Sequence, residues 1–230
     1  EEARQQIEDI ILSTKACQAE VAMTYSDRAR AFFLTEPLEG INYHNSVYRI
    51  YQSIMDTGIH RDLLFEGASL EGYKVLWTPY IPYLSDEYFN RAKLFVENGG
   101  TWIVGPITGG RTEEHTVHTD TGLGKLDQFA GVETEFTFSL TDTDSEGNAL
   151  GVKAPLGLWS AVFKPKGARI KGLIEGGMAA GKAFLTEYNV GKGKVVMLGS
   201  TPQGDEGELM LQKIIEHYSL TANVEIKTDV

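Results

Sequence analysis

The chain has 230 residues, of which 42% are hydrophobic, enough for one large α/β domain with a substantial core or for two small domains. Its 32 acidic and 21 basic side chains give a net charge of −11, which would repel the phosphates of nucleic acids and anionic lipid surfaces. A single cysteine, Cys17, allows no internal disulfide, and no apolar run approaches the ~18 residues of a membrane span, so we expect a soluble globular protein with neither nucleic acid nor membrane as partner.

The first half of the chain alternates helical and strand patterns. Residues 1–17 carry isoleucines at helical spacing and lead directly into a strand, and because no initiator methionine is present we expect a piece of a longer protein. Ser85 has the character of a helix N-cap, while Gly99 and Gly100 provide a stop for the same helix. The patterns predict strands at residues 19–25, 60–65, 73–80 and 101–106 and helices at 41–58 and 85–100. This alternation favours a mainly parallel, flavodoxin-like sheet with right-handed crossovers.

The second half of the chain has a different pattern, rich in strands. A late helix at residues 204–220 closes it, and the polar stretch 108–121 is the longest candidate surface loop. Strands are expected at residues 132–140 and around 158–163, 168–175, 181–188 and 194–199. We therefore expect an α/β protein with a β-rich C-terminal part.

The turn after the strand at 101–106 has the spacing of a nucleophile elbow. Gly105-Pro106-Ile107-Thr108-Gly109 places small residues two positions on either side of a central residue, as that sharp turn requires. The central residue is Ile107, which has no group that can attack a substrate. A tight structural turn is therefore the favoured interpretation.

Two further segments come close to ligand-binding loops. Residues 176–183 match a phosphate loop except that Ala183 replaces the Ser or Thr that binds magnesium, and a strand pattern follows where a helix is needed. Residues 142–153 begin like a calcium loop, but Lys153 takes the place of the bidentate glutamate. We expect no cofactor or metal at either segment.

Two sets of side chains leave alternative functions open. His115 and His118, with Glu114 beside them, would bind a transition metal if the loop folded back, as in a stand-alone metal-assisted hydrolase; a solvated polar loop is the simpler interpretation. An aromatic set could stack on sugar, as in a carbohydrate-binding module, although a core or subunit contact explains it equally well: Tyr43, Tyr48, Tyr51, Tyr73, Trp77, Tyr80 and Tyr83.

Taken in order, the segments resemble the trimerisation domain of glycoside hydrolase family 42 β-galactosidases over residues 18–200. The most specific part is "VENGGTWIVGP" followed by "TGGRTEEH", supported by "GKGKVVMLGS" near the end. The resemblance implies an α/β sandwich similar to class I glutamine amidotransferases but without their chemistry, in agreement with Ile107. The family typically continues Pro-Arg-Thr-Gly after its "GGT" strand, and this chain lacks that arginine.

The resemblance also implies how the chain is organised and what it does. Residues 1–17 would be a linker helix from a preceding (β/α)₈ barrel, 18–220 the domain itself and 221–230 a tail. The domain would be non-catalytic and would hold three copies of a β-galactosidase together, with its own barrel and itself as partners and no cofactor. The two catalytic glutamates would lie in the barrel, outside this sequence, and the whole protein would hydrolyse terminal β-D-galactosides. Either a cytoplasmic or a periplasmic location is compatible with the sequence. Candidate contact residues, at the subunit interface or near a neighbour's active site, are Tyr80, Tyr83, Arg111, Glu114, His115 and His118.

Overall fold

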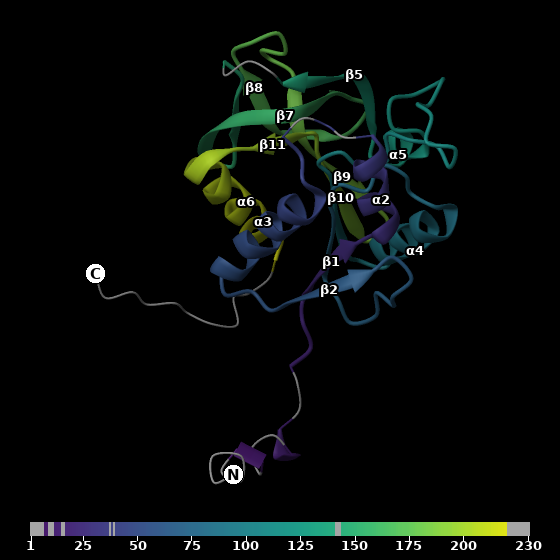
Figure 1. The fold of residues 1–230 in the computed structure, drawn as a ribbon, viewed down its shortest axis with the longest axis vertical. Helices are drawn as coiled ribbons and strands as arrows, with labels where there is room; N and C mark the ends of the chain where they lie inside the picture. The colour runs from purple at the N-terminus through teal and green to yellow at the C-terminus, as the bar shows by residue number, and fades with distance from the viewer. Residues whose placement is uncertain are drawn as a thin grey trace, which may run out of the picture.

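The computed structural model describes residues 7–8, 12–14, 17–36, 38, 40–140 and 144–219 (Figure 1). Residues 7–8 and 12–13 are helical, while the rest of the expected leading helix and the tail 221–230 lie outside the described residues. The first half alternates strands and helices as predicted, with one helix, α2, that was not expected: β1 (Val21–Tyr25), α2 (Asp27–Thr35), α3 (Tyr43–Asp56), β2 (Arg61–Phe65), β3 (Val75–Thr78), α4 (Asp86–Glu97) and β4 (Thr101–Val104).

The second half is rich in strands, as its sequence pattern indicates. Four elements differ from expectation: α5, β6 and β11 were not predicted, and β7 is much longer than the segment 158–163. The elements are α5 (Lys125–Phe129), β5 (Val132–Leu140), β6 (Glu146–Ala149), β7 (Val152–Pro165), β8 (Arg169–Glu175), β9 (Ala183–Val190), β10 (Gly193–Leu198), β11 (Ser200–Pro202) and α6 (Gly204–Tyr218).

All the strands belong to one mixed sheet. Its order is β11-β7-β6-β8-β9-β10-β4-β3-β1-β2, with β5 paired to β7. Strands β10, β4, β3, β1 and β2 run parallel, whereas the pairings from β9 to β11 and that of β5 are antiparallel. Helices α3 and α6 pack side by side, with α6 also against β7 and β11, and α4 packs against β4 and β10 (Figure 1). The fold is therefore α/β, with a mixed rather than a mainly parallel sheet.

Side-chain caps fix where the helices of the parallel half begin. The oxygens of Ser26, Asn42 and Ser85 each accept a hydrogen bond from a backbone N–H of the first helical turn. The predicted N-cap at Ser85 is thus confirmed, and Asp86 and Glu87 follow it at the positive end of the helix dipole. These caps set α4 against the sheet so that its apolar side reaches the core.

A tyrosine from α4 fills the crevice between β1 and β3. The hydroxyl of Tyr88 lies 2.6 Å from the side-chain oxygens of both Thr24 and Thr78, and the indole of Trp102 donates to Thr78 at 2.8 Å. The strand order reverses between β1 and β3, which is where parallel sheets of this kind commonly bind ligands. In this chain the protein's own side chains occupy that position.

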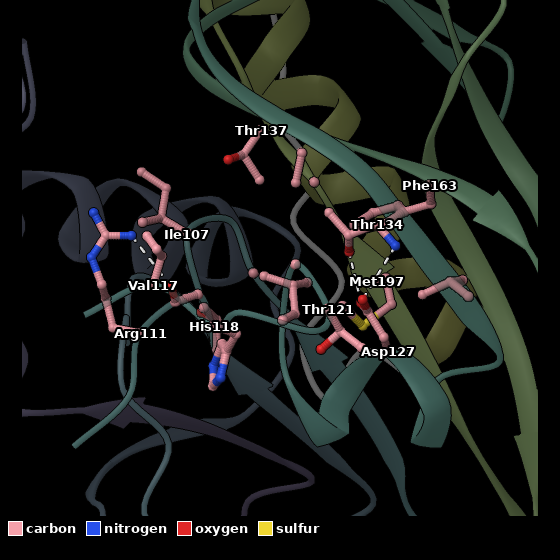
Figure 2. Close-up of a pocket in the computed structure, with 18 of the residues that line it drawn as sticks. Ile107, Arg111, Val117, His118, Thr121, Asp127, Thr134, Thr137, Phe163 and Met197 are labelled. Carbon is pink, nitrogen blue, oxygen red and sulfur yellow. Dashed lines mark hydrogen bonds between the residues drawn. The ribbon is translucent and has the colours of Figure 1, made fainter. Parts of the chain in front are cut away.

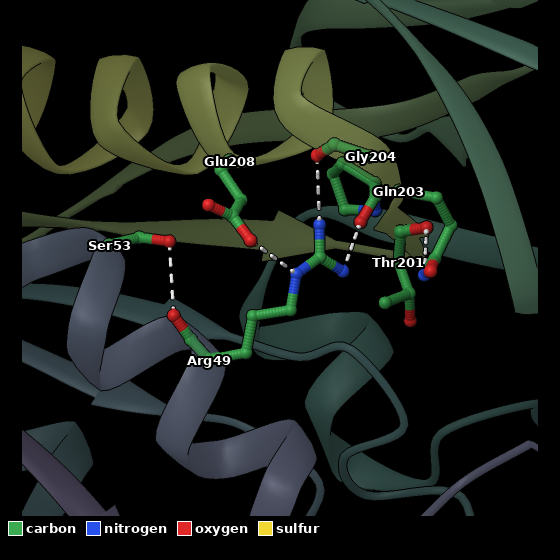
Figure 3. Close-up of polar contacts among 7 residues, drawn as sticks. Arg49, Ser53, Thr201, Gln203, Gly204 and Glu208 are labelled. Atoms are coloured by element: carbon green, nitrogen blue, oxygen red, sulfur yellow. Dashed lines mark hydrogen bonds and ion pairs between the residues drawn. The ribbon is translucent and has the colours of Figure 1, made fainter.

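Arg49 joins α3 to the start of α6 (Figure 3). Its guanidinium donates to the backbone oxygens of Pro202 at 2.7 Å and Gly204 at 3.3 Å, and it lies 3.4 Å from the carboxylate of Glu208. The two carbonyls belong to the β11–α6 connection, so one side chain holds the C-terminal helix against the N-terminal half. No helix among the described residues is both long and apolar enough to cross a membrane.

Candidate functional site

A cavity of about 940 Å³ opens at the carboxyl ends of β4 and β10 (Figure 2). Its floor is apolar and includes Val104, Met197 and Phe163. The loop between β4 and α5 forms one wall, and β5 with β7 forms the other. Ligands of α/β proteins commonly bind at the carboxyl ends of the strands, so the residues that line this cavity are the candidates for binding or catalysis.

The turn that enters the cavity has elbow geometry without a nucleophile. Gly105 has φ +102°, and a Cβ at this position would lie 2.1 Å from the backbone oxygen of Leu198, so only glycine fits. Ile107 has φ +51°, Gly109 has φ +81°, and the Ile107 side chain lines the cavity. The turn predicted from the sequence is present, and its central side chain can contribute contact area but no covalent chemistry.

The two histidines of the long loop contact different parts of the domain. The ring of His115 stacks on Phe32 of α2 with centroids 5.3 Å apart. The Nε2 of His118 lies 3.1 Å from the backbone oxygen of Gly109. Among the described residues, no group of three His, Cys, Asp or Glu side chains is placed to hold a metal ion. The structure therefore gives no support to the metal-assisted hydrolase.

The loop is fastened to α2 at several points. Arg28 lies 4.6 Å from the ring centre of Tyr83 and 4.0 Å from the carboxylate of Glu113. Arg111 lies 3.6 Å from the carboxylate of Glu36, and its backbone pairs with that of Tyr83. Three of the expected contact residues, Tyr83, Arg111 and His115, are thus brought together beside α2.

Glu114 stands on the exposed side of this loop. The hydroxyl of Thr112 donates to its carboxylate at 3.0 Å. Hydrogen bonds from its own backbone N–H and from Thr112 lower the pKa of Glu114. A carboxylate held ionised at the surface is suited to a contact with a cation on another molecule.

Tyr80 is buried inside the domain, so the expectation that it contacts another subunit is wrong. Its side chain is only 2% exposed, and burial raises the pKa of its hydroxyl. The backbone at Tyr80 turns to φ +53° directly after β3, which carries the side chain inward. Two more members of the aromatic set proposed for sugar stacking, Tyr43 and Trp77, are also buried, whereas Tyr48 is exposed and Tyr51, Tyr73 and Tyr83 are partly exposed.

The two other ligand-like segments have structural roles. Residues 176–182 connect the antiparallel strands β8 and β9, as expected for a loop between strands. Lys153 of β7 pairs with Glu175 of β8 at 2.5 Å, across the intervening strand β6. The start of the calcium-like segment, with Asp142, lies outside the described residues.

The sequence did not single out the strand side of the cavity. Trp159 of β7 and Phe136 of β5 line this wall. Leu158, just before Trp159, has φ +67°, and the register of β7 against β11 shifts at this point. A tryptophan directly after a Gly-Leu pair in a strand pattern was the available signal, but a bulge depends on pairing with distant strands.

Comparison with known proteins places the chain in a family. The family model for the β-galactosidase trimerisation domain matches residues 19–225. The β-galactosidases YesZ of Bacillus subtilis and Bacillus licheniformis are 54% and 52% identical over the whole chain, which spans 35% of the length of each.

Solved structures share the fold at low sequence identity. A β-galactosidase from Bacillus circulans sp. alkalophilus superimposes with a TM-score of 0.82 and 23% identity, covering 92% of this chain and 32% of that one. A β-galactosidase from Halorubrum lacusprofundi gives 0.80 and 19%, covering 90% and 31%. On the match of its family model, the chain belongs to the family of β-galactosidase trimerisation domains.

Proposed function

We propose that this chain is the segment through which three copies of a β-galactosidase associate, and that the whole protein hydrolyses terminal β-D-galactosides. The observation that carries the proposal is the family match over residues 19–225, together with 54% identity to a β-galactosidase along the full chain. The elbow at Ile107 agrees with it, because a domain that associates without reacting needs no nucleophile.

We place the chemistry of the whole protein outside this chain. The relatives are about three times longer than the chain, which leaves room for a preceding barrel that carries two catalytic glutamates. Residues 1–17 are then the linker from that barrel, 18–220 the trimerisation domain and 221–230 a tail. The closed crevice at Tyr88 and the elbow at Ile107 support an amidotransferase-like fold that has no active site.

The contact with a neighbouring copy is assigned to the loop face, which we define as Tyr83, Arg111, Glu114, His115, Val117 and His118. Val117 is 62% exposed at the mouth of the cavity, an unusual position for a branched apolar side chain. Because α2 holds the loop through Phe32, Arg28 and Glu36, the face is already ordered before a partner arrives. A preformed surface avoids the entropy cost of ordering a loop on association. Head-to-tail contacts of this face with a different face of the next copy would close a ring of three.

The test is a charge placed on the loop face of the full-length protein. Val117→Asp should convert the trimer into smaller species at micromolar concentration, because an aspartate buried in an apolar contact is strongly unfavourable. Leu94→Asp is the matched control, since Leu94 is 59% exposed on α4, away from the loop. If both variants stay trimeric, or if only Leu94→Asp dissociates, the loop face is not the contact. Mass by light scattering gives the result, and β-galactosidase activity of the same samples tests the proposed reaction.

A further inference from the structure

Two walls of the cavity contain backbone conformations that bulky residues rarely adopt. Ile107 on the loop side and Leu158 on the strand side have φ values of +51° and +67°. Such residues in the left-handed region cost about 1 to 3 kcal/mol each and persist where the surrounding structure imposes them, often at binding sites. Both strained positions adjoin the same cavity, since Ile107 lines it directly and Leu158 precedes the lining residue Trp159.

The strain at Leu158 accompanies a β-bulge that positions Trp159. Opposite β11, Ser200 pairs with Ser160 whereas Thr201 pairs with Gly157, so two residues of β7 are unmatched at this point. Bulges of this kind bend a strand and redirect a side chain, and they are common beside binding sites. Trp159 is half-buried and lines the cavity, whereas Trp77 and Trp102 are completely buried elsewhere.

The basic side chains of Arg111 and Lys166 in the cavity lining are already paired with carboxylates. Of the described residues that line it, Arg111 lies 3.6 Å from Glu36, and Lys166 lies 2.6 Å from Glu133. Carboxylates outnumber these cations in the lining, with Asp120, Asp127 and Glu135 in addition; Glu135 pairs with Lys182 at 2.6 Å, so the excess negative charge comes from Asp120 and Asp127. The cavity is therefore acidic, and it would repel a phosphate or a carboxylate on a ligand.

The remaining surface combines aromatic faces with hydroxyl and carboxylate oxygens. Trp159 and the partly exposed Phe136 supply apolar faces, and Thr137 and Asp120 supply polar atoms at the rim. Figure 2 shows Thr137 at the edge of the cavity, away from the paired Asp127 and Thr134. A pyranose ring has the matching character, with an apolar face that stacks on an aromatic ring and hydroxyls that donate to carboxylates.

We propose that this cavity is a non-catalytic binding site for an uncharged saccharide, with Trp159 as its stacking surface. Its volume of about 940 Å³ accommodates more than one sugar ring. The bound sugar keeps all its bonds, because Ile107 stands where a nucleophile would be needed. Arg111, Val117 and His118 belong both to the cavity lining and to the loop face, so the saccharide site adjoins the proposed contact between copies.

Tryptophan fluorescence of the 230-residue chain tests the proposal directly. The chain has three tryptophans, and because Trp77 and Trp102 are 0% exposed, a ligand-dependent change reports on Trp159. Galactose and lactose should each give a saturable change, while galactose 6-phosphate should bind about tenfold more weakly or worse because of the acidic lining. A response that does not saturate, or equal binding of the phosphorylated sugar, would overturn the proposal.

Variants measured by calorimetry identify the site. Trp159→Ala should weaken binding of lactose by about tenfold or more, while Trp159→Phe should keep most of the affinity and lose the fluorescence response. Phe65→Ala is the control, since Phe65 is an exposed aromatic on the edge strand β2. Thr137→Trp changes an exposed residue and should block the cavity without harming the fold. Unchanged lactose binding in both Trp159→Ala and Thr137→Trp would refute the assignment.

Light scattering of the same samples separates this proposal from the proposed function. A trimer that binds neither galactose nor lactose would refute the saccharide site and leave the trimer intact. A monomer that binds lactose through Trp159 would support the site and contradict association through this chain alone.

Discussion

The rings of Phe32 and His115 stack with their centroids 5.3 Å apart and their planes inclined by 19°. Phe32 belongs to α2, and His115 lies near the middle of the long polar loop. Arg111 lies 5.8 Å from the centre of the same Phe32 ring, so one aromatic side chain supports two loop residues. A segment whose sequence is typical of a mobile loop is thus fixed against a helix, and it forms part of the loop face that we propose as the contact between copies.

Replacing His115 should therefore destabilise the loop, by an amount that depends on how well the new residue tolerates the backbone conformation at this position. His115 has φ +61°, which alanine tolerates poorly and glycine adopts freely. Both His115→Ala and His115→Gly lose the stacking contact, but the alanine variant also keeps the strain, so we expect it to be the less stable by about 1 kcal/mol. Urea unfolding and protease sensitivity of the loop measure the effect. An alanine variant more stable than the glycine variant would contradict this explanation.

Removing the Tyr88 hydroxyl should destabilise the sheet. Tyr88→Phe leaves the oxygens of Thr24 and Thr78 without their shared partner in a buried crevice, which costs about 1 to 3 kcal/mol. Tyr48→Phe is the matched control, because Tyr48 is exposed on α3 and should change the free energy of unfolding by less than about 0.5 kcal/mol. Equal stabilities of the two variants in urea would show that the hydroxyl network contributes nothing.

The same tyrosine predicts a loss of stability in alkali. Burial raises the pKa of Tyr88 to about 12 from its ordinary value of 10.0. Below pH 10 the hydroxyl is neutral in both states, and its contribution to stability is complete; between pH 10 and 12 the unfolded state ionises first, so the contribution falls. Between pH 10 and 12 the free energy of unfolding should therefore decline more steeply in the unsubstituted 230-residue chain than in the Tyr88→Phe variant. Parallel pH profiles of the two proteins would contradict the assignment.

The turn after β4 should tolerate no side chain at its first position. Gly105→Ala brings a Cβ to 2.1 Å from the oxygen of Leu198 at φ +102°, so the β4 and β10 strands must separate; we expect a loss of more than about 2 kcal/mol. Gly67→Ala is the control, since a Cβ there meets nothing within 4 Å, and the expected change is within about 0.5 kcal/mol. Thermal unfolding of both variants gives the comparison, and a fully stable Gly105→Ala protein would rule out the close contact.

The parallel half of the fold could be predicted because its signals are local. Ser85 caps α4 through its own neighbours, and the buried strands β3 and β4 are short apolar runs bounded by turn residues. The absence of a nucleophile at Ile107 was equally readable, because an elbow is defined by five consecutive residues. Features that depend only on residues adjacent in the chain, such as a helix cap or an elbow turn, can be predicted from the sequence.

The positions of three side chains were not predicted correctly from the sequence, because they depend on the three-dimensional fold. Tyr80 has the composition of an interface residue, but its left-handed backbone carries it into the core. His115 has the spacing of a metal ligand, but Phe32, more than eighty positions earlier, holds its ring. Trp159 reaches the cavity through a bulge set by β11, about forty residues later. No local pattern encodes the contact of His115 with Phe32 or the bulge opposite β11.

Light scattering of the 230-residue chain over a series of concentrations tests the central claim most directly. We predict a mass near three times 25.4 kDa that persists on dilution to the micromolar range. A mass of 25.4 kDa at every concentration would contradict the claim that this domain carries the contact between copies.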